Sequence, residues 1–139
     1  MTKPHDLKGK RVLVLGGETA LGRALAVGLA EAGADVAIAS LSPGPEAEFA
    51  INSALNELWA MGRGGLALAI DASDEAQLRE AVERVERELG RLDGAVVVAD
   101  EPLALTCEAL RAALSDRPML VLDPHATPAD ALRAVSERL

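Results

Sequence analysis

The sequence has 139 residues, of which 50% are hydrophobic, and a formal net charge of −8. The length suits one domain with a single core, and the apolar content is that of a folded globular protein. The negative charge repels nucleic-acid phosphates and anionic membranes, and only 1% of the residues are aromatic, so base-stacking platforms are missing and nucleic-acid binding is disfavoured.

No apolar stretch approaches the roughly 20 residues of a membrane span, and the polar start of the chain does not resemble a signal peptide. We therefore expect a cytoplasmic protein without a membrane partner, and a flexible N-terminus over residues 1–8. Cys107 is the single cysteine, which rules out an internal disulfide. No Cys/His cluster has metal-ligand spacing, so no metal is expected.

Short apolar runs alternate along the chain with longer segments of helical periodicity. In chain order the pattern predicts strand 12–15, helix 19–32, strand 36–40, helix 46–61, strand 66–70, a helix from 74 to 89, strand 95–99, a short helix from near Thr106, strand 119–122 and helix 128–139. Strands that alternate strictly with helices indicate a parallel sheet with right-handed crossovers.

The fold class expected from this alternation is α/β, a Rossmann-like three-layer α/β/α domain that spans residues 1–139. We predict a five-stranded parallel sheet in the order 3-2-1-4-5, with the flavodoxin-like order 2-1-3-4-5 as the alternative. No repeat, linker or low-complexity segment interrupts the alternation.

Details of the helices follow from local signals. Asp74 is predicted to cap its helix, with Gln77 as a capping-box partner. Trp59 is expected to face inward from the second helix. The third helix carries charges that can pair at i,i+4 on a solvated face, namely Arg79 with Glu83, Glu80 with Arg84, and Glu83 with Arg87.

A glycine-containing loop joins the first predicted strand to the first helix, and its sequence is Gly16-Gly17-Glu18-Thr19-Ala20-Leu21-Gly22. In such a loop, glycines allow a tight turn and a close approach of a pyrophosphate. The following helix N-terminus offers free N–H groups and a partial positive charge. The alternative reading is a tight turn with close helix–sheet packing and no ligand.

The stretch from residue 7 to 22 resembles the start of a short-chain dehydrogenase/reductase, a family that carries T-G-x-x-x-G-x-G here. Leu15 stands at its threonine, Gly16 and Gly22 match its outer glycines, and Ala20 replaces the middle one. Residues 30–36, 70–74 and 90–94 are also similar to the family, and the likeness covers roughly residues 7–100.

The resemblance implies NAD or NADP as the cofactor. The residues that it places around the cofactor are Gly16, Gly17, Glu18, Thr19, Ala20, Leu21, Gly22, Ser40, Asp71, Ala72 and Ala99. Asp71 matches the family's aspartate that contacts adenine, although a cap or turn for the next helix is the alternative. Ser40 is neither acidic nor basic, so the sequence does not choose between the two cofactors.

Several positions depart from the family pattern. The family's Asn-Asn-Ala-Gly motif falls on residues 97–100, which read Val-Val-Ala-Asp. Its catalytic serine is unmatched at residues 123–125, its Tyr-x-x-x-Lys helix falls on residues 128–139, and the sequence contains no tyrosine at all. The only lysines, Lys3, Lys8 and Lys10, precede the first strand. The resemblance therefore implies that the usual proton relay is missing and that no residue is catalytic.

Acidic residues are expected at the ends of the strands where a cofactor would bind, namely Glu18, Asp100, Glu101 and Asp123. Carboxylates beside a pyrophosphate would weaken its binding, whereas in water they are ordinary loop residues. His125 is either a general base or a loop histidine, and the absence of an evident nucleophile favours the second reading.

Three functions compete on this sequence. The first is a non-catalytic relative of the reductases that binds NAD(P) or an adenine nucleotide weakly. The second is a nucleotide-free interaction or scaffold domain, a homodimer joined through the edge of the fifth strand or through the last two helices. The third is an oxidoreductase whose site is completed by a partner chain.

Overall fold

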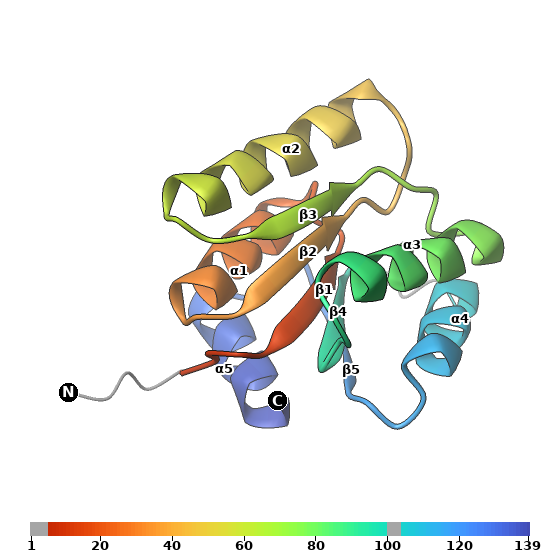
Figure 1. Ribbon diagram of the computed structural model, residues 1–139. Helices are drawn as coiled ribbons and strands as arrows, with labels where there is room; N and C mark the ends of the chain where they lie inside the picture. The colour runs from red at the N-terminus through yellow and green to blue at the C-terminus, as the bar shows by residue number, and fades with distance from the viewer. Residues whose placement is uncertain (1–5, 100–103) are drawn as a thin grey trace.

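The computed structural model describes residues 6–99 and 104–139. One parallel sheet of five strands runs through its centre in the order β3-β2-β1-β4-β5, with helices on both faces (Figure 1). This arrangement confirms the predicted order 3-2-1-4-5 and the three-layer fold class, and the flavodoxin-like alternative is wrong.

The ten elements alternate strictly and begin and end within one or two residues of the predicted positions. They are β1 (Arg11–Leu15), α1 (Ala20–Glu31), β2 (Asp35–Ala39), α2 (Pro45–Ala60), β3 (Gly65–Leu68), α3 (Glu75–Glu88), β4 (Gly94–Val98), α4 (Ala104–Leu114), β5 (Met119–Leu122) and α5 (Pro128–Arg138).

The sheet is buried on both faces, which is why its central strands read as unbroken aliphatic runs. In β1, Val12 and Val14 face the side covered by α1, α2 and α5, whereas Leu13 and Leu15 face α3 and α4. Every residue of β4 is buried. The valines of β4 are therefore core residues of a central strand.

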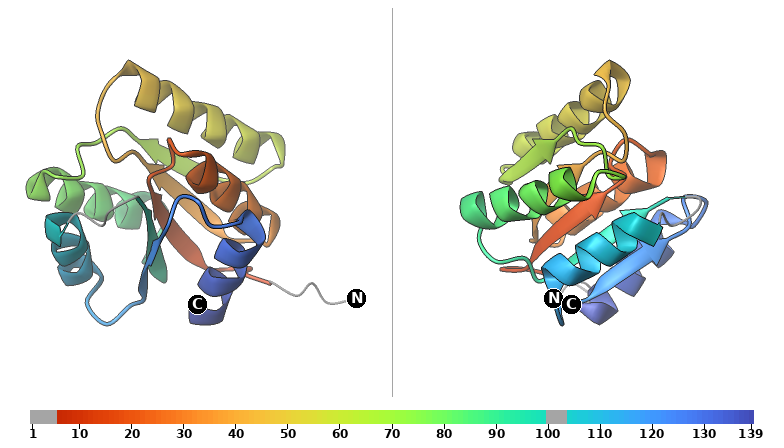
Figure 2. Two further views of the ribbon diagram at one scale, coloured as in Figure 1. Left: turned by 180° about the vertical axis from the view of Figure 1, so that it is seen from behind. Right: turned by 90° about the vertical axis from the view of Figure 1, so that its right-hand side faces the viewer.

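The last helix lies on an unexpected face. α5 packs on α1, where Ala131 and Val135 are buried beside Leu25, while α4 packs on α3 across the sheet (Figures 1 and 2). A right-handed crossover that continued outward from β5 would run on the face of α3 and α4. Because α4 and α5 lie on opposite faces of the sheet, they do not share one continuous surface within the chain.

The outer face of α2 corrects one prediction. Trp59, expected to face inward, is 58% exposed, and Phe49 is 78% exposed. The buried stripe of α2 is made by Ile51, Leu55 and Leu58, at spacings of four and three residues. Trp59 lies one residue beyond Leu58, at the margin of that stripe, so its indole faces solvent.

The helix α3 begins as predicted but pairs its charges differently. The Asp74 carboxylate accepts hydrogen bonds from the N–H groups of Ala76 and Gln77, and the bond from Gln77 is the main reason that the pKa of Asp74 lies below its usual value. The ion pairs that form are Glu75–Arg79 and Arg84–Glu88, not the three predicted pairs. Arg79 and Arg84 each have a glutamate four residues away on both sides, and such exposed pairs differ in free energy by only about a few tenths of a kcal/mol.

The start of the described chain is anchored. Residues 1–5 of the expected flexible N-terminus lie outside the described residues. Leu7 is buried, and its N–H donates to the carbonyl of Ala32 at 2.8 Å. No helix in the described part of the chain is long and apolar enough to cross a membrane.

Candidate functional site

The glycines of the loop between β1 and α1 are required by close packing. Gly16 has a φ of +98°, and a Cβ added there would lie 2.3 Å from the carbonyl oxygen of Val98 in β4. A Cβ on Gly22 would lie 2.1 Å from the carbonyl oxygen of Gly16, and one on Gly17 would lie 2.1 Å from Cγ2 of Ile38. The backbone of the loop therefore lies directly against the neighbouring strands and against α1.

The N-terminus of α1 is open. Thr19 is the N-cap, and its hydroxyl accepts from the N–H of Gly22 at 3.0 Å and donates to the carbonyl of Gly16 at 2.7 Å. Among the described residues, the N–H groups of Ala20 and Leu21 have no hydrogen-bond partner. Unpaired N–H groups at a helix N-terminus are suited to an anion such as a phosphate.

Glu18 points away from this helix end. Its carboxylate accepts hydrogen bonds from the N–H of Leu41 at 2.9 Å and from the N–H of Ser42 at 3.2 Å. These contacts join the glycine loop to the chain that follows β2. Glu18 therefore does not block the open end of α1.

Of the other members of the expected acidic group, only Asp123 lies within the described residues. Asp123 is exposed, and its carboxylate accepts from the N–H of His125 at 2.8 Å, within one loop. Asp100 and Glu101 lie outside the described residues, as does the Cys107 side chain. His125 is exposed on this same loop after β5.

Ser40 has a structural role that the sequence did not reveal. It is fully buried, and its hydroxyl donates to the carbonyl of Ile70 at 3.1 Å and accepts from the N–H of Ile70 at 3.0 Å. The side chain thereby continues the pairing of β2 and β3 beyond their last residues. It points into the protein rather than toward a cofactor.

Asp71 closes a turn before α3. One of its carboxylate oxygens accepts from the N–H of Ser73 at 3.0 Å and from the Ser73 hydroxyl at 2.5 Å, while its own N–H donates to the side chain of Gln77. The cap of α3 is Asp74, so Asp71 is a turn residue and not the helix cap. Its partners leave the second carboxylate oxygen without a hydrogen bond among the described residues.

The remaining predicted positions, Ala72 and Ala99, have small buried side chains. Ala72 is buried, and its N–H donates to the carbonyl of Leu41 at 2.9 Å, which brings the segment after β3 beside the segment after β2. Ala99 is buried at the end of β4. The predicted cofactor-binding residues thus come together at the carboxyl ends of β1, β2, β3 and β4, where open α/β sheets bind ligands.

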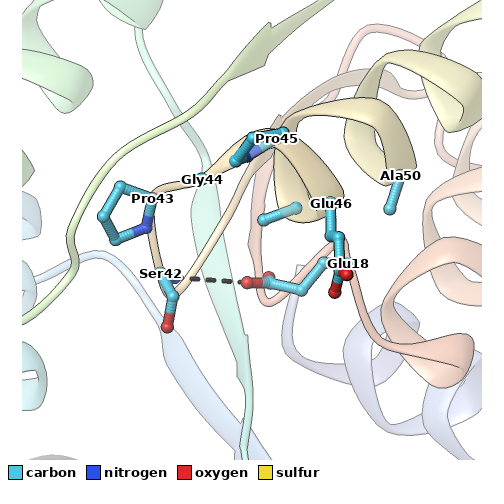
Figure 3. A pocket seen from close by; sticks show the side chains of 8 residues that line it. Glu18, Ser42, Pro43, Gly44, Pro45, Glu46 and Ala50 are labelled. Carbon is cyan, nitrogen blue, oxygen red and sulfur yellow. Dashed lines mark hydrogen bonds between the residues drawn. The ribbon is translucent and has the colours of Figure 1, made fainter.

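A cavity of about 630 Å³ adjoins this edge of the sheet. It is lined by Glu18, residues 42–47 and Ala50, and so lies between the glycine loop and the start of α2 (Figure 3). Glu46, in the first turn of α2, was not predicted as a site residue. The Ser-Pro-Gly-Pro turn after the second strand was the sequence signal that could have located this side of the cavity.

The described residues contain no group of three or more His, Cys, Asp or Glu side chains that could hold a metal ion. The chemistry available at the edge of the sheet is that of backbone N–H groups, the carboxylates of Glu18, Glu46 and Asp71, and small apolar side chains.

A parallel sheet in the order 3-2-1-4-5, whose first strand leads through a glycine loop into an open helix end, defines a Rossmann-type α/β protein. The family model described as short chain dehydrogenase matches residues 10–110. The chain belongs to the short-chain dehydrogenase/reductase family.

Individual relatives agree with this assignment. The chain is 34% identical over 103 residues to a cyclohexanol dehydrogenase from Rhodococcus sp. (strain TK6), covering 69% of this chain and 38% of the relative. It is 36% identical over 99 residues to the uncharacterized oxidoreductase YghA from Escherichia coli (strain K12), covering 71% and 33%. The chain thus spans about a third of the length of these curated relatives.

Several solved structures superpose on the chain. A short-chain type dehydrogenase/reductase from Mycobacterium marinum has a TM-score of 0.70 at 28% identity, covering 84% of this chain and 56% of that one. A blue fluorescent protein from a metagenomic library, in complex with NADPH, has a TM-score of 0.65 at 26% identity, covering 84% and 56%. An NAD+-bound xylitol dehydrogenase has a TM-score of 0.59 at 26% identity, covering 65% and 33%.

Proposed function

We propose that this chain is a nucleotide-binding member of its family that binds NAD or NADP, or an adenine nucleotide, and does not itself perform the family's redox step. The observation that carries the proposal is the N-terminus of α1, where the N–H groups of Ala20 and Leu21 have no hydrogen-bond partner within residues 6–99 and 104–139 and lie beside closely packed glycines. A pyrophosphate fits such a helix end through hydrogen bonds and the helix dipole.

The proposed cofactor-binding residues are those predicted from the sequence: Gly16, Gly17, Glu18, Thr19, Ala20, Leu21, Gly22, Ser40, Asp71, Ala72 and Ala99. In this proposal the loop backbone holds the pyrophosphate, and the oxygen of Asp71 that is free among the described residues accepts a hydrogen bond from the adenine amino group. Ser40 acts through its backbone, since its hydroxyl is committed to Ile70.

The non-catalytic part of the proposal rests on the side chains that the sequence provides. It contains no tyrosine, and its lysines, at positions 3, 8 and 10, all precede β1. The nicotinamide would supply hydride transfer when bound, but the chain offers no tyrosine to move the accompanying proton. An oxidoreductase completed by a partner chain is the competing proposal, and steady turnover of alcohols by the purified chain alone would contradict ours.

Nucleotide binding can be tested with a charge placed on the proposed phosphate position. Ala20 is exposed at the first position of α1, where an added carboxylate suits the helix dipole, so Ala20→Asp is expected to fold normally. We expect isothermal titration calorimetry to detect binding of NAD+ or NADP+ to the wild type and at least tenfold weaker binding to Ala20→Asp.

The matched control is Ala20→Asn, which has nearly the same shape without the charge and should bind within about threefold of the wild type. Absence of any heat with NAD+, NADP+ and ATP at millimolar concentration would contradict the proposal. Equal binding by all three proteins would instead show that the nucleotide does not bind at the N-terminus of α1.

The cytoplasmic location expected from the sequence stays a prediction.

We also propose that two copies of the chain pair through the edge of β5. All four residues of β5 are only half-buried, and its outer edge pairs with no strand among the described residues. Exposed strand edges favour pairing with a second chain. Multi-angle light scattering at high concentration should give the mass of a dimer, and a monomer would count against this pairing and against the scaffold reading.

A further inference from the structure

We propose that the nucleotide site selects NAD over NADP, and that Glu18 is the residue that imposes the choice. The inference rests on the proposed function, because it assigns a preference to that same site. Its starting point is the position of the Glu18 carboxylate, which accepts hydrogen bonds from the N–H groups of Leu41 and Ser42. Figure 3 shows the contact with Ser42.

Two successive backbone N–H groups directed at one point form a small anion site, which a phosphate would otherwise use. Glu18 fills this site with an anion of the chain's own: one oxygen lies 2.9 Å from the nitrogen of Leu41, and the other lies 3.0 Å from Leu41 and 3.2 Å from Ser42. A second anion at this point would have to displace the carboxylate or lie against it.

The surroundings offer nothing to neutralise a phosphate. The cavity beside Glu18 is lined by a second carboxylate, Glu46, and by prolines, glycine, serine and alanines, with no lysine or arginine among its lining residues. Arg23, the cation nearest to the loop in sequence, is held by Ser53 and Glu57 on α2. A phosphate monoester carries close to two negative charges near neutral pH and would meet two like charges here.

A ribose with a free 2′-hydroxyl suits the same surroundings. A carboxylate has acceptor capacity left after two N–H bonds, and the ribose hydroxyls are donors. In dinucleotide-binding sheets an acidic residue after the second strand grips this ribose. That position is Ser40 here, which is buried and bonded to Ile70, so the glycine loop supplies the carboxylate instead.

The test compares NAD+ and NADP+ binding by calorimetry in the wild type and in Glu18→Gln and Glu18→Ala. We expect the wild type to bind NAD+ at least about tenfold more tightly than NADP+. Glu18→Gln keeps an acceptor for the N–H groups but loses the charge. In this variant the affinity for NAD+ should exceed that for NADP+ by about threefold or less. Glu18→Ala exposes both N–H groups and should raise NADP+ affinity above that of the wild type.

Glu48→Ala is the matched control. It also removes one glutamate charge, but Glu48 is in the first turn of α2 and does not line the cavity. It should leave the NAD+/NADP+ ratio unchanged. Wild-type affinity for NADP+ equal to or above that for NAD+, or an unchanged ratio in both Glu18 variants, would overturn the inference alone. Binding of neither NAD+ nor NADP+ would overturn this inference, and absence of ATP binding as well would overturn the proposed function with it.

Discussion

The substitution Gly22→Ala is expected to lower the free energy of unfolding by about 3 kcal/mol or more, whereas Gly28→Ala is expected to raise it by about 0.5–1 kcal/mol. Both glycines belong to α1, so both substitutions gain the same helix propensity. The opposite signs arise from what the new methyl group meets.

At Gly22 the new Cβ would lie 2.1 Å from the carbonyl oxygen of Gly16, 2.8 Å from its carbonyl carbon and 2.9 Å from the Thr19 hydroxyl. Two of these atoms are backbone, so the clash can be relieved only by moving α1 away from the glycine loop. At Gly28 the nearest atom is Cδ2 of Leu132 at 3.5 Å, which is ordinary van der Waals contact. Alanine therefore fits there and fills space between α1 and α5.

Urea denaturation of the two variants and the wild type measures both effects with one method. A neutral Gly22→Ala would mean that α1 does not approach the loop as closely as described. A loss of stability in Gly28→Ala would contradict the packing of α5 on α1, in which Leu132 leaves room for a methyl group. Gly22→Ala should also lose nucleotide binding, because the same movement shifts the N–H groups of Ala20 and Leu21.

The elements of this protein were predictable because their signals are local. Each signal depends on a few neighbouring residues: a glycine after a buried run, a Thr-Pro pair at the start of α5, or a leucine repeat in α1. The strand order followed because right-handed crossovers leave few ways to wind five parallel strands. The predicted site residues met at one edge for the same reason, since the carboxyl ends of parallel strands share that edge.

The errors and omissions concern contacts between segments that are distant in sequence. Glu18 meets Leu41 and Ser42, and Ser40 bonds Ile70; no local pattern specifies either contact. Trp59 was misplaced because a position at the margin of a helical stripe can turn either way, and packing against the sheet decided it. The face occupied by α5 depends on the complementary surface of α1, which its own periodicity does not describe.

Arg117 offers the second large effect, because its guanidinium holds together three segments at the amino-terminal edge of the sheet. It donates to the carbonyl oxygens of Ala113, Leu114 and Leu92 and to the carboxylate of Glu86, at distances of 2.6–3.0 Å. The side chains of Arg117 and Glu86 are only 14% and 29% exposed. Hydrogen bonds to charged groups in such partly buried positions contribute about 1.5–3 kcal/mol.

We expect Arg117→Met, which keeps the apolar stem, to lower the free energy of unfolding by about 2–3 kcal/mol at neutral pH. It removes one hydrogen-bond donor from each of three carbonyl groups and from the Glu86 carboxylate. Arg117→Lys is the matched control: it keeps the charge but not the planar fork, and should recover no more than about half of the loss. Urea denaturation measures both, and a loss below about 0.5 kcal/mol for Arg117→Met would contradict the clamp.

The same clamp predicts a dependence on pH. Burial alone raises the pKa of Glu86, but the hydrogen bond from the Leu92 N–H and the Arg117 guanidinium outweigh it, so the pKa lies below the ordinary value of 4.5. The unfolded chain therefore binds more protons than the folded one in this window, and stability rises with pH. The contribution of Glu86 is complete above its unfolded-state pKa and is lost as the pH falls through the folded-state value. Glu86→Gln cannot titrate at this position, so its free energy of unfolding should fall less than that of the wild type when the pH is lowered from about 6 to about 3. An identical fall in both proteins would show that Glu86 does not link the clamp to acid stability.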